Sequence, residues 1–265
     1  MSHNDAAVAY GNYLKIDELL SLQHPRSEGP EHDEMLFIVI HQVYELWFKE
    51  LLHELDYLQG RLTEHDTPRA QHTLKRILTI LKVAVAQIDV LETMTPLEFL
   101  SFRDRLESGS GFQSHQFREI ELALGLKDRR KVEHYPAGSA ARVRLEARYA
   151  RPTLWDSFLR YLAHEGCPVP PEQLGRDVTR PIEPSAALQR ALLELYRTNP
   201  LATQLCERLV DLDEGLQEWR YRHVKMVQRT IGTKGGTGGS SGAEYLATTL
   251  NRPVFPDLWA IRTDL

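Results

Sequence analysis

The stretch FIVIHQVYELWFKELL, residues 37–52, decides the fold class of this 265-residue chain. Its apolar residues recur at offsets of three and four, and this spacing extends from Asp33 to Leu62, which fits an amphipathic helix better than a strand. At about 1.5 Å per residue, such a helix is roughly 45 Å long. His41 lies within it, and an imidazole on a largely apolar helix face either finds a polar partner or binds a metal.

A second histidine has a similar setting near the other end of the chain. His223, in EWRYRHVKMVQRTIG (218–232), belongs to the longest candidate helix, Leu201 to Ile231. The loop GTKGGTGGSSG (232–242) follows, and six of its eleven residues are glycine. Two histidines on long apolar helices, together with such a loop, indicate an iron or haem pocket that a mobile loop closes.

Capping signals predict two further helices between these long runs. Thr67 and Pro68 supply an N-cap and a first-turn proline for a helix that packs beside the first one. Thr95 to Glu98 satisfies a capping box, so a third helix begins there.

The remaining segments complete an all-helical prediction. Helices are expected at 115–126 and 185–199, with short helices on the surface at 127–160. Five prolines make 168–184 a loop. No strand-rich segment, hairpin signature or internal repeat is evident. The sequence therefore predicts an all-α protein, a single-domain bundle of long core helices over residues 1–265.

Composition excludes several classes of partner. With 32 basic and 37 acidic side chains the chain has a net charge of -5, which gives no sign of a nucleic-acid footprint. Cys167 and Cys206 lie far apart and outside any CxxC pattern, so two reduced thiols are expected rather than a disulfide or a thiolate zinc site. The longest apolar stretch, 35–40, is too short to span a bilayer. We expect a cytoplasmic protein with neither a nucleic-acid nor a membrane partner.

The glycine loop and the histidines leave several site chemistries open. Glycine loops cradle phosphate through backbone N–H groups, but loop 232–242 lacks the GK[ST] of a Walker motif and follows a helix. A flexible tether is equally compatible with its composition. A di-iron bundle needs paired Glu-x-x-His motifs, and only Glu50 with His53 provides one, so His53 is interpreted as an ordinary surface or interhelical residue. A haem site needs only one neutral imidazole and a wide apolar slot.

Arg103 is a candidate for binding an acidic group. It follows Phe99 by four residues, so both side chains share a helix face. The guanidinium could bind a substrate carboxylate through two parallel hydrogen bonds beside an aromatic wall. The alternative is a surface arginine paired with Asp104 or Glu107, and spacing alone favours that alternative.

Five blocks of the sequence resemble the tryptophan 2,3-dioxygenase family, in order along the chain. They are YGNYL (10–14), HDEMLFIVIHQVYELWFKELLHEL (32–55), FLSFRDRLESGSGFQS (99–114), WRYRHVKMVQRTIG (219–232) and GTGGSSG (236–242). The resemblance implies an all-helical, haem b-dependent homotetramer. It also implies an enzyme that opens the indole ring of L-tryptophan with O2 to give N-formylkynurenine, the first step of tryptophan degradation by the kynurenine pathway.

The same resemblance assigns roles to five residues around the expected haem. It makes His223 the axial ligand of the haem iron and places His41 on the opposite side, near the indole N–H. His41 is then a catalytic-site residue that orients the substrate and tunes the pocket, without being an obligatory base. Phe37 and Phe99 wall the indole, and Arg103 holds the substrate carboxylate.

The resemblance also implies contacts from mobile parts of the chain. Thr237, in the glycine loop, holds the ammonium and carboxylate end of the substrate. Residues 1–20 form an N-terminal arm, from which Tyr10 and Tyr13 reach into the pocket of a neighbouring subunit. His115 departs from the apolar or aromatic residue that is more usual in the family, which bears on local packing only.

Three rival functions remain at this point. A related haem dioxygenase could act on other indoleamines, and the carboxylate clamp of Arg103 with Thr237 discriminates against it. A haem sensor would bind the cofactor without turnover. A helical interaction protein would bind no cofactor at all.

Overall fold

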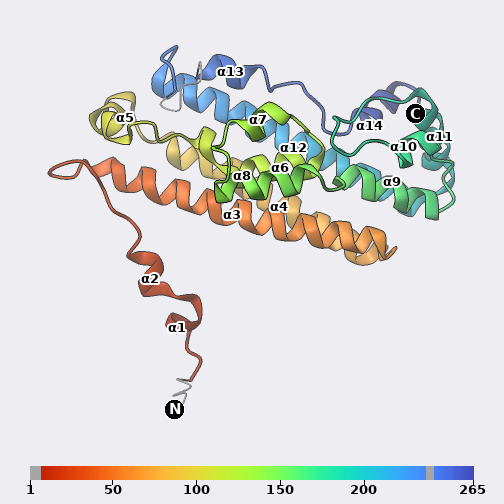
Figure 1. The fold of residues 1–265 in the computed structure, drawn as a ribbon, viewed down its shortest axis with the longest axis horizontal. Helices are drawn as coiled ribbons and strands as arrows, with labels where there is room; N and C mark the ends of the chain where they lie inside the picture. The colour runs from red at the N-terminus through yellow and green to blue at the C-terminus, as the bar shows by residue number, and fades with distance from the viewer. Residues whose placement is uncertain (1–6, 237–241) are drawn as a thin grey trace.

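Two helices of 32 residues each frame the molecule in the computed structural model, which describes residues 7–236 and 242–265. They are α3 (His32–Thr63) and α12 (Pro200–Ile231), and α4 (Thr67–Leu91) packs against both (Figure 1). The long helices expected at 33–62 and 201–231 are therefore confirmed. No strand occurs among the described residues, in agreement with the all-α prediction.

The start of α4 corrects one prediction. Its N-cap is Asp66, whose side chain accepts a hydrogen bond from the backbone N–H of Arg69 at 3.1 Å. Thr67 is instead the first helical residue, and its hydroxyl lies 2.8 Å from the Tyr161 hydroxyl. The sequence pattern missed the shift because Asp and Thr are both good N-caps.

The expected capping box of α5 (Pro96–Arg103) is confirmed. The Glu98 carboxylate accepts from the Thr95 backbone N–H at 2.6 Å, and the Thr95 hydroxyl accepts from the Glu98 N–H at 3.4 Å. Two 3-10 turns follow, η1 (Asp104–Leu106) and η2 (Gly111–Gln113), and lead into α6 (His115–Leu124). Helix α5 lies at the same end of the bundle as the start of α3 (Figure 1).

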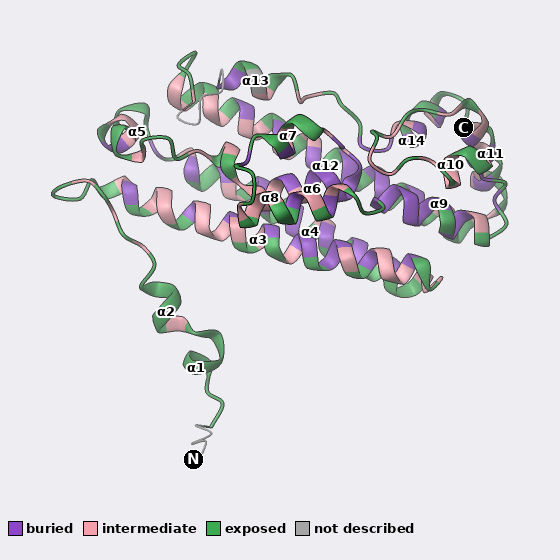
Figure 2. Cartoon of the chain, in the orientation of Figure 1, coloured by how far each residue is buried: buried purple, intermediate pink, exposed green. Residues whose placement is uncertain are grey.

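The expectation of surface helices across 127–160 is wrong for its last part. Helices α7 (Arg129–Glu133) and α8 (Ala140–Tyr149) form a small peripheral cluster around Val132 and Leu145. Helix α9 (Leu154–His164), in contrast, packs on α3 and buries Trp155 and Phe158 in the main core (Figure 2). The segment before α9 is rich in basic residues, so the average composition of 127–160 did not indicate an apolar helix.

The C-terminal part closes the opposite end of the bundle. It comprises α10 (Pro171–Leu174), α11 (Ala186–Thr198), α14 (Pro256–Ala260) and η3 (Ile261–Thr263), whereas α13 (Ala243–Ala247) packs on α12 towards the end where α5 lies (Figure 1). One hydrophobic core includes residues from both sides of the proline-rich segment 168–184.

Asp213 attaches the chain end to α12. Its buried carboxylate accepts hydrogen bonds from the backbone N–H groups of Val254 and Phe255, at 2.7 and 3.1 Å, and from the Trp259 indole N–H at 2.9 Å. Three donors satisfy this charge inside the core, so the last residues of the chain are fixed against the helix that carries His223.

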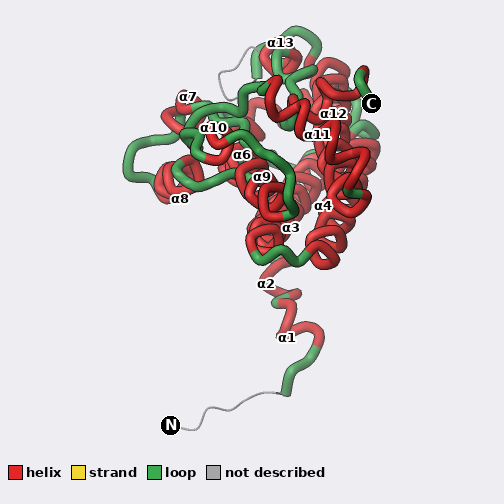
Figure 3. Tube along the Cα trace, turned by 90° about the vertical axis from the view of Figure 1, so that its right-hand side faces the viewer, coloured by secondary structure: helices red, strands yellow, loops and turns green. Residues whose placement is uncertain are grey.

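The N-terminal arm stands away from the bundle. Its two short helices, α1 (Tyr10–Leu14) and α2 (Ile16–Leu20), project from the body in both views (Figures 1 and 3). The base of the arm is attached to α3, because the buried Glu34 carboxylate accepts from the backbone N–H groups of Arg26 and Ser27 at 2.6 and 3.0 Å.

Two further expectations concern the cysteines and the possibility of a membrane-spanning helix. Cys167 and Cys206 are free and buried, as expected. Within residues 7–236 and 242–265, no helix combines the length and the apolar content needed to cross a membrane.

We predict that Phe158→Ala lowers the free energy of unfolding by about 3–5 kcal/mol, because truncating a large buried side chain loses its transfer free energy and leaves a cavity. Phe158 is 1% exposed and packs between the rings of Trp155 and Tyr161. Urea denaturation followed by circular dichroism measures the change. Leu201→Ala, at a position 60% exposed, is the control and should shift stability by no more than about 0.5 kcal/mol. A small effect at Phe158 would contradict the burial of α9.

Candidate functional site

A large cavity opens where α3, α5, α6 and α12 meet. It is partly open to solvent. Phe37, His41, Phe99, Arg103 and His223 all line it. The structure thus brings together every described residue that was expected in the pocket, apart from the two arm tyrosines.

His41 is held in one tautomer by its own helix. Its Nδ1 lies 2.7 Å from the carbonyl oxygen of Phe37. Because a carbonyl only accepts hydrogen bonds, Nδ1 carries the proton and Nε2 of the neutral ring keeps its lone pair. Burial lowers the pKa of His41, although the Phe37 carbonyl and the Glu45 carboxylate oppose this shift. A neutral His41 therefore presents Nε2 as an acceptor, suited to an N–H group.

His223 lies on α12, one turn after Trp219. The two rings stack with their centroids 5.1 Å apart and their planes 5° from parallel. Burial, reinforced by nearby His41 and Arg118, lowers the pKa of His223 to about 4. The ring is therefore neutral near pH 7, which is the form that binds a metal. Among the described residues it contacts the Trp219 ring but forms no hydrogen bond, so the one basic lone pair of the neutral ring is free for a ligand.

Aromatic side chains line the cavity in two groups. Phe37 packs against His41 at 4.1 Å and against Phe99 at 5.8 Å between ring centroids. On the His223 side, Phe117 lies 4.8 Å from Trp219. A neutral imidazole above a wide apolar slot is what haem requires of a protein, so these residues fit the expected cofactor.

Arg103 joins α5 to the glycine loop. Its Nη2 donates a hydrogen bond to the Gly235 carbonyl oxygen at 2.7 Å, and the side chain lines the cavity. The surface alternative is wrong in the described part of the chain, because neither Asp104 nor Glu107 pairs with Arg103, and Glu107 lies 3.6 Å from Arg26 instead. A cation at the mouth of an apolar cavity suits a ligand carboxylate.

Thr237 lies outside the described residues, but the loop on either side of it reaches the cavity. Gly236 and Gly242 both line the pocket. Gly242 has a φ of +63°, and a Cβ there would meet the Lys234 carbonyl oxygen at 2.8 Å. Only glycine fits this close approach of backbone to backbone.

Tyr10 and Tyr13 do not reach the cavity of their own chain. They are 77% and 74% exposed on the projecting arm (Figure 2). His53, as expected, is an exposed residue of α3. His115 is half-buried, and its Nδ1 is buried without a hydrogen-bond partner in the described chain.

A buried charge cluster at the wall of the cavity was not predicted from the sequence. Glu121 accepts from Arg118, from Lys131 at 3.1 Å and from Arg220 at 3.1 Å. Burial opposes ionisation, but the three cations outweigh it and lower the pKa of Glu121 to about 2. Three cations face one carboxylate, so the cluster is net positive, and Arg118, Glu121 and Arg220 line the cavity.

No sequence signal distinguishes this cluster from surface charge. Arg118 and Glu121 are three residues apart on one helix, a spacing that is common on solvated faces. Arg220 adjoins Trp219 in the WRYRH block, and this is the only hint of its location.

Comparison with known proteins gives concordant matches. A family model described as tryptophan 2,3-dioxygenase matches residues 1–144 and 153–265. A protein of that name from Herpetosiphon aurantiacus is 65% identical over 259 residues, which cover 98% of this chain and 99% of the relative. A protein with the same name from Anaeromyxobacter sp. (strain K) is 60% identical, over 98% of this chain and 97% of the relative. Another from Caulobacter vibrioides is 44% identical, over 97% of this chain and 98% of the relative.

We predict that Glu121→Gln destabilises the fold by about 3–5 kcal/mol at pH 7, because it leaves buried cations without their counter-charge. The pKa of Glu121 is lower in the folded than in the unfolded chain, so its stabilising effect is complete above about pH 4.5 and is lost as the pH falls towards 2. Urea denaturation at several pH values should show the gap between wild type and variant closing below pH 4.5. Glu218→Gln, at an exposed position of α12, is the control. A gap unchanged at pH 2.5 would contradict the ionised cluster.

Proposed function

The chain belongs to the tryptophan 2,3-dioxygenase family, and we propose that the cavity between α3, α5, α6 and α12 is where it opens the indole ring of L-tryptophan. The reaction inserts both atoms of O2 across the C2–C3 bond and gives N-formylkynurenine, the first step of tryptophan degradation by the kynurenine pathway. One observation carries the assignment to this cavity: Phe37, His41, Phe99, Arg103 and His223 line it together from three separate helices.

Haem b is the cofactor that the cavity fits, and His223 would bind its iron. The neutral His223 ring and the apolar walls support this assignment. When bound, haem supplies the redox-active iron that dioxygen chemistry needs. Arg118 and Arg220, which line the cavity, offer cations to the propionate groups.

L-Tryptophan is bound by groups matched to its three parts. The free lone pair on Nε2 of His41 accepts the indole N–H and orients the ring, while Phe37 and Phe99 wall the ring and exclude water. Arg103 pairs with the carboxylate, and Thr237 binds the ammonium and carboxylate end. His41 acts by holding the N–H proton in a hydrogen bond and is not an obligatory base.

Family membership favours turnover over the haem-sensor and cofactor-free alternatives. A dioxygenase with broader indoleamine specificity remains the second candidate, because an apolar pocket alone accepts any indole. The guanidinium of Arg103 at the cavity mouth argues for a substrate that carries a carboxylate.

The remaining expectations stay predictions. They are a single domain over residues 1–265, a cytoplasmic location and the absence of a nucleic-acid partner.

We predict that Arg103→Ala lowers kcat/KM for L-tryptophan about 30- to 1000-fold, equivalent to about 2–4 kcal/mol, because a charge-assisted contact to the carboxylate is lost. Tryptamine, which has no carboxylate, should be affected far less. Arg103→Lys should recover only part of the loss, since a point charge cannot form two parallel hydrogen bonds. Steady-state formation of N-formylkynurenine from each substrate measures this. Equal turnover of both substrates by the wild type would favour the broader indoleamine reading.

We predict that His223→Ala loses haem or retains it only weakly, because the truncated side chain offers the iron no strong ligand. His41→Ala should keep its haem and lose only part of its activity, since it removes an orienting hydrogen bond. Haem content is measured from the Soret band and from the iron content of purified protein. Wild-type haem content in His223→Ala would remove His223 from its role, and complete haem loss in His41→Ala would reverse the two assignments.

We further propose a homotetramer in which the arm, with Tyr10 and Tyr13, completes a neighbour's pocket. Its apolar side chains are exposed in the single chain, including Val8, Tyr10, Tyr13 and Leu20, and such exposure indicates an interface.

We expect light scattering to give four times the 30.4 kDa chain mass. A Tyr10→Ala/Tyr13→Ala variant should be less active, and co-assembly with Arg103→Ala chains should restore activity, because one subunit supplies the arm and another the pocket. A fully active monomer would contradict both the assembly and the arm's role.

A further inference from the structure

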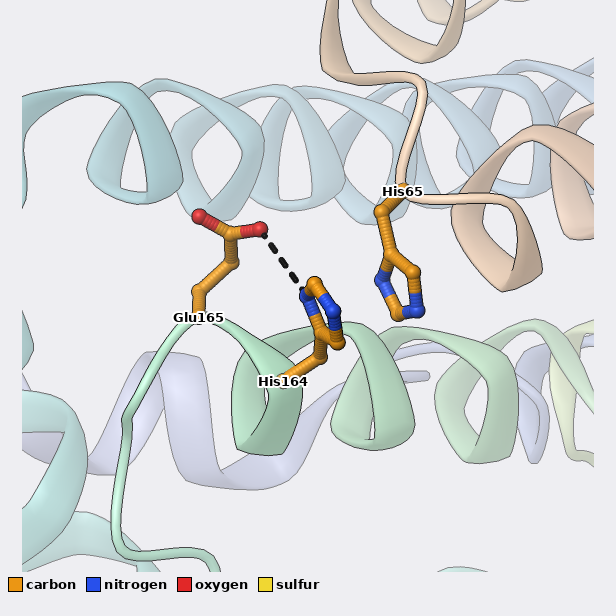
Figure 4. Close-up of side chains that lie close together, drawn as sticks. All are labelled: His65, His164 and Glu165. Carbon is orange, nitrogen blue, oxygen red and sulfur yellow. Dashed lines mark hydrogen bonds and ion pairs between the residues drawn. The ribbon is translucent and has the colours of Figure 1, made fainter.

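A second group of potential metal ligands lies at the end of the bundle opposite the cavity. His65, in the turn between α3 and α4, meets His164, the last residue of α9, and the adjacent Glu165 (Figure 4). One potential ligand atom from each side chain lies within 4.8 Å of the others. The two imidazole centroids are 3.4 Å apart, and His164 Nδ1 is 3.5 Å from a Glu165 carboxylate oxygen.

One ring nitrogen of His65 is available to bind a ligand. Its Nδ1 is buried and has no hydrogen-bond partner among the residues that the structure describes. The neighbouring Tyr161 ring packs 6.3 Å away, but its hydroxyl is engaged with Thr67 at 2.8 Å. Leaving a buried ring nitrogen unpaired costs free energy, so a ligand for this nitrogen would stabilise the turn.

We propose that His65, His164 and Glu165 bind one Zn²⁺ ion, with water in the fourth position. Two imidazoles and one carboxylate form a ligand set that Zn²⁺ takes in proteins when one position stays open. Zn²⁺ also binds such nitrogen and oxygen donors more tightly than Mn²⁺ or Fe²⁺ does.

Binding requires a local contraction around His65. Tetrahedral Zn²⁺ with ligands at about 2.1 Å holds its donor atoms about 3.4 Å apart, closer than the 4.8 Å limit that encloses them here. The His164 and Glu165 side chains are 59% and 31% exposed, so they can turn toward His65 without repacking the core. The His164 ring must rotate out of its stacked position for its nitrogen to point at the ion.

This site is separate from the cavity. From His41 to the end of α3 at Thr63 there are 22 residues, about 33 Å at about 1.5 Å per residue. A bound ion would link the α3–α4 turn to the end of α9. It would therefore stabilise that end of the bundle without contacting the substrate.

The test is isothermal titration of the haem-loaded, tag-free protein with Zn²⁺ after treatment with EDTA. We expect one ion per chain with a micromolar or lower Kd, and a rise in thermal midpoint with Zn²⁺. His65→Asn should weaken binding at least about 100-fold and abolish the rise, and Glu165→Gln at least about 10-fold, since even outer contacts of metal sites contribute 10- to 100-fold. Asn suits position 65 because it tolerates the positive φ of 60° found there.

His53→Gln is the matched control, because it removes an exposed histidine of α3 outside the cluster. Zinc-edge X-ray absorption should show nitrogen and oxygen neighbours near 2.1 Å with imidazole scattering in the wild type only. The proposal is overturned if no saturable binding occurs below about 100 µM Zn²⁺. It is equally overturned if His65→Asn binds as tightly as the wild type, or if His53→Gln loses as much affinity as His65→Asn.

Discussion

The contact of α4 with α3 on one side and α12 on the other is the constraint on which the rest of this molecule depends. These three helices supply about half of the main core, and their packing determines how His41 on α3 and His223 on α12 face one cavity. Because close-packed helices shift only in discrete steps, the two imidazoles are positioned by many apolar contacts far from either ring. The positions of these two imidazoles are thus set by the bundle and not by the loops that border the cavity.

The cavity has one neutral side and one positively charged side. The two histidines stay neutral because burial lowers their pKa values, whereas the buried Glu121 stays ionised because three cations around it lower its pKa. One wall of the cavity is therefore neutral and apolar, and another is positive. Such a division suits a flat apolar group with an anionic edge. Arg103 likewise provides a positive charge at the mouth of the cavity.

Much of the fold was predictable from the sequence, and so were the described pocket residues. Helical periodicity located α3 and α12 because each buries one long apolar stripe, and the Thr95 capping box located α5. The burial of α9 was not predictable from composition, because its core residues follow a basic segment. The partners of Glu121 are up to 99 residues away along the chain, and such pairings arise only from tertiary packing. Helical spacing singled out His41 and His223, whereas the roles of Phe37, Phe99, Arg103, Thr237 and the arm came from the family resemblance.

Asp213 makes α12 dependent on a distant segment of the chain. Its buried carboxylate accepts three hydrogen bonds from residues 254–259, more than 40 positions further along the chain, and one from Gln217 on the same helix. Displacing residues 254–259 would leave this carboxylate in the core with most of its donors missing, which costs free energy. A truncation or a tag that disturbs this segment would therefore weaken the helix that carries His223 from the end of the bundle opposite the cavity.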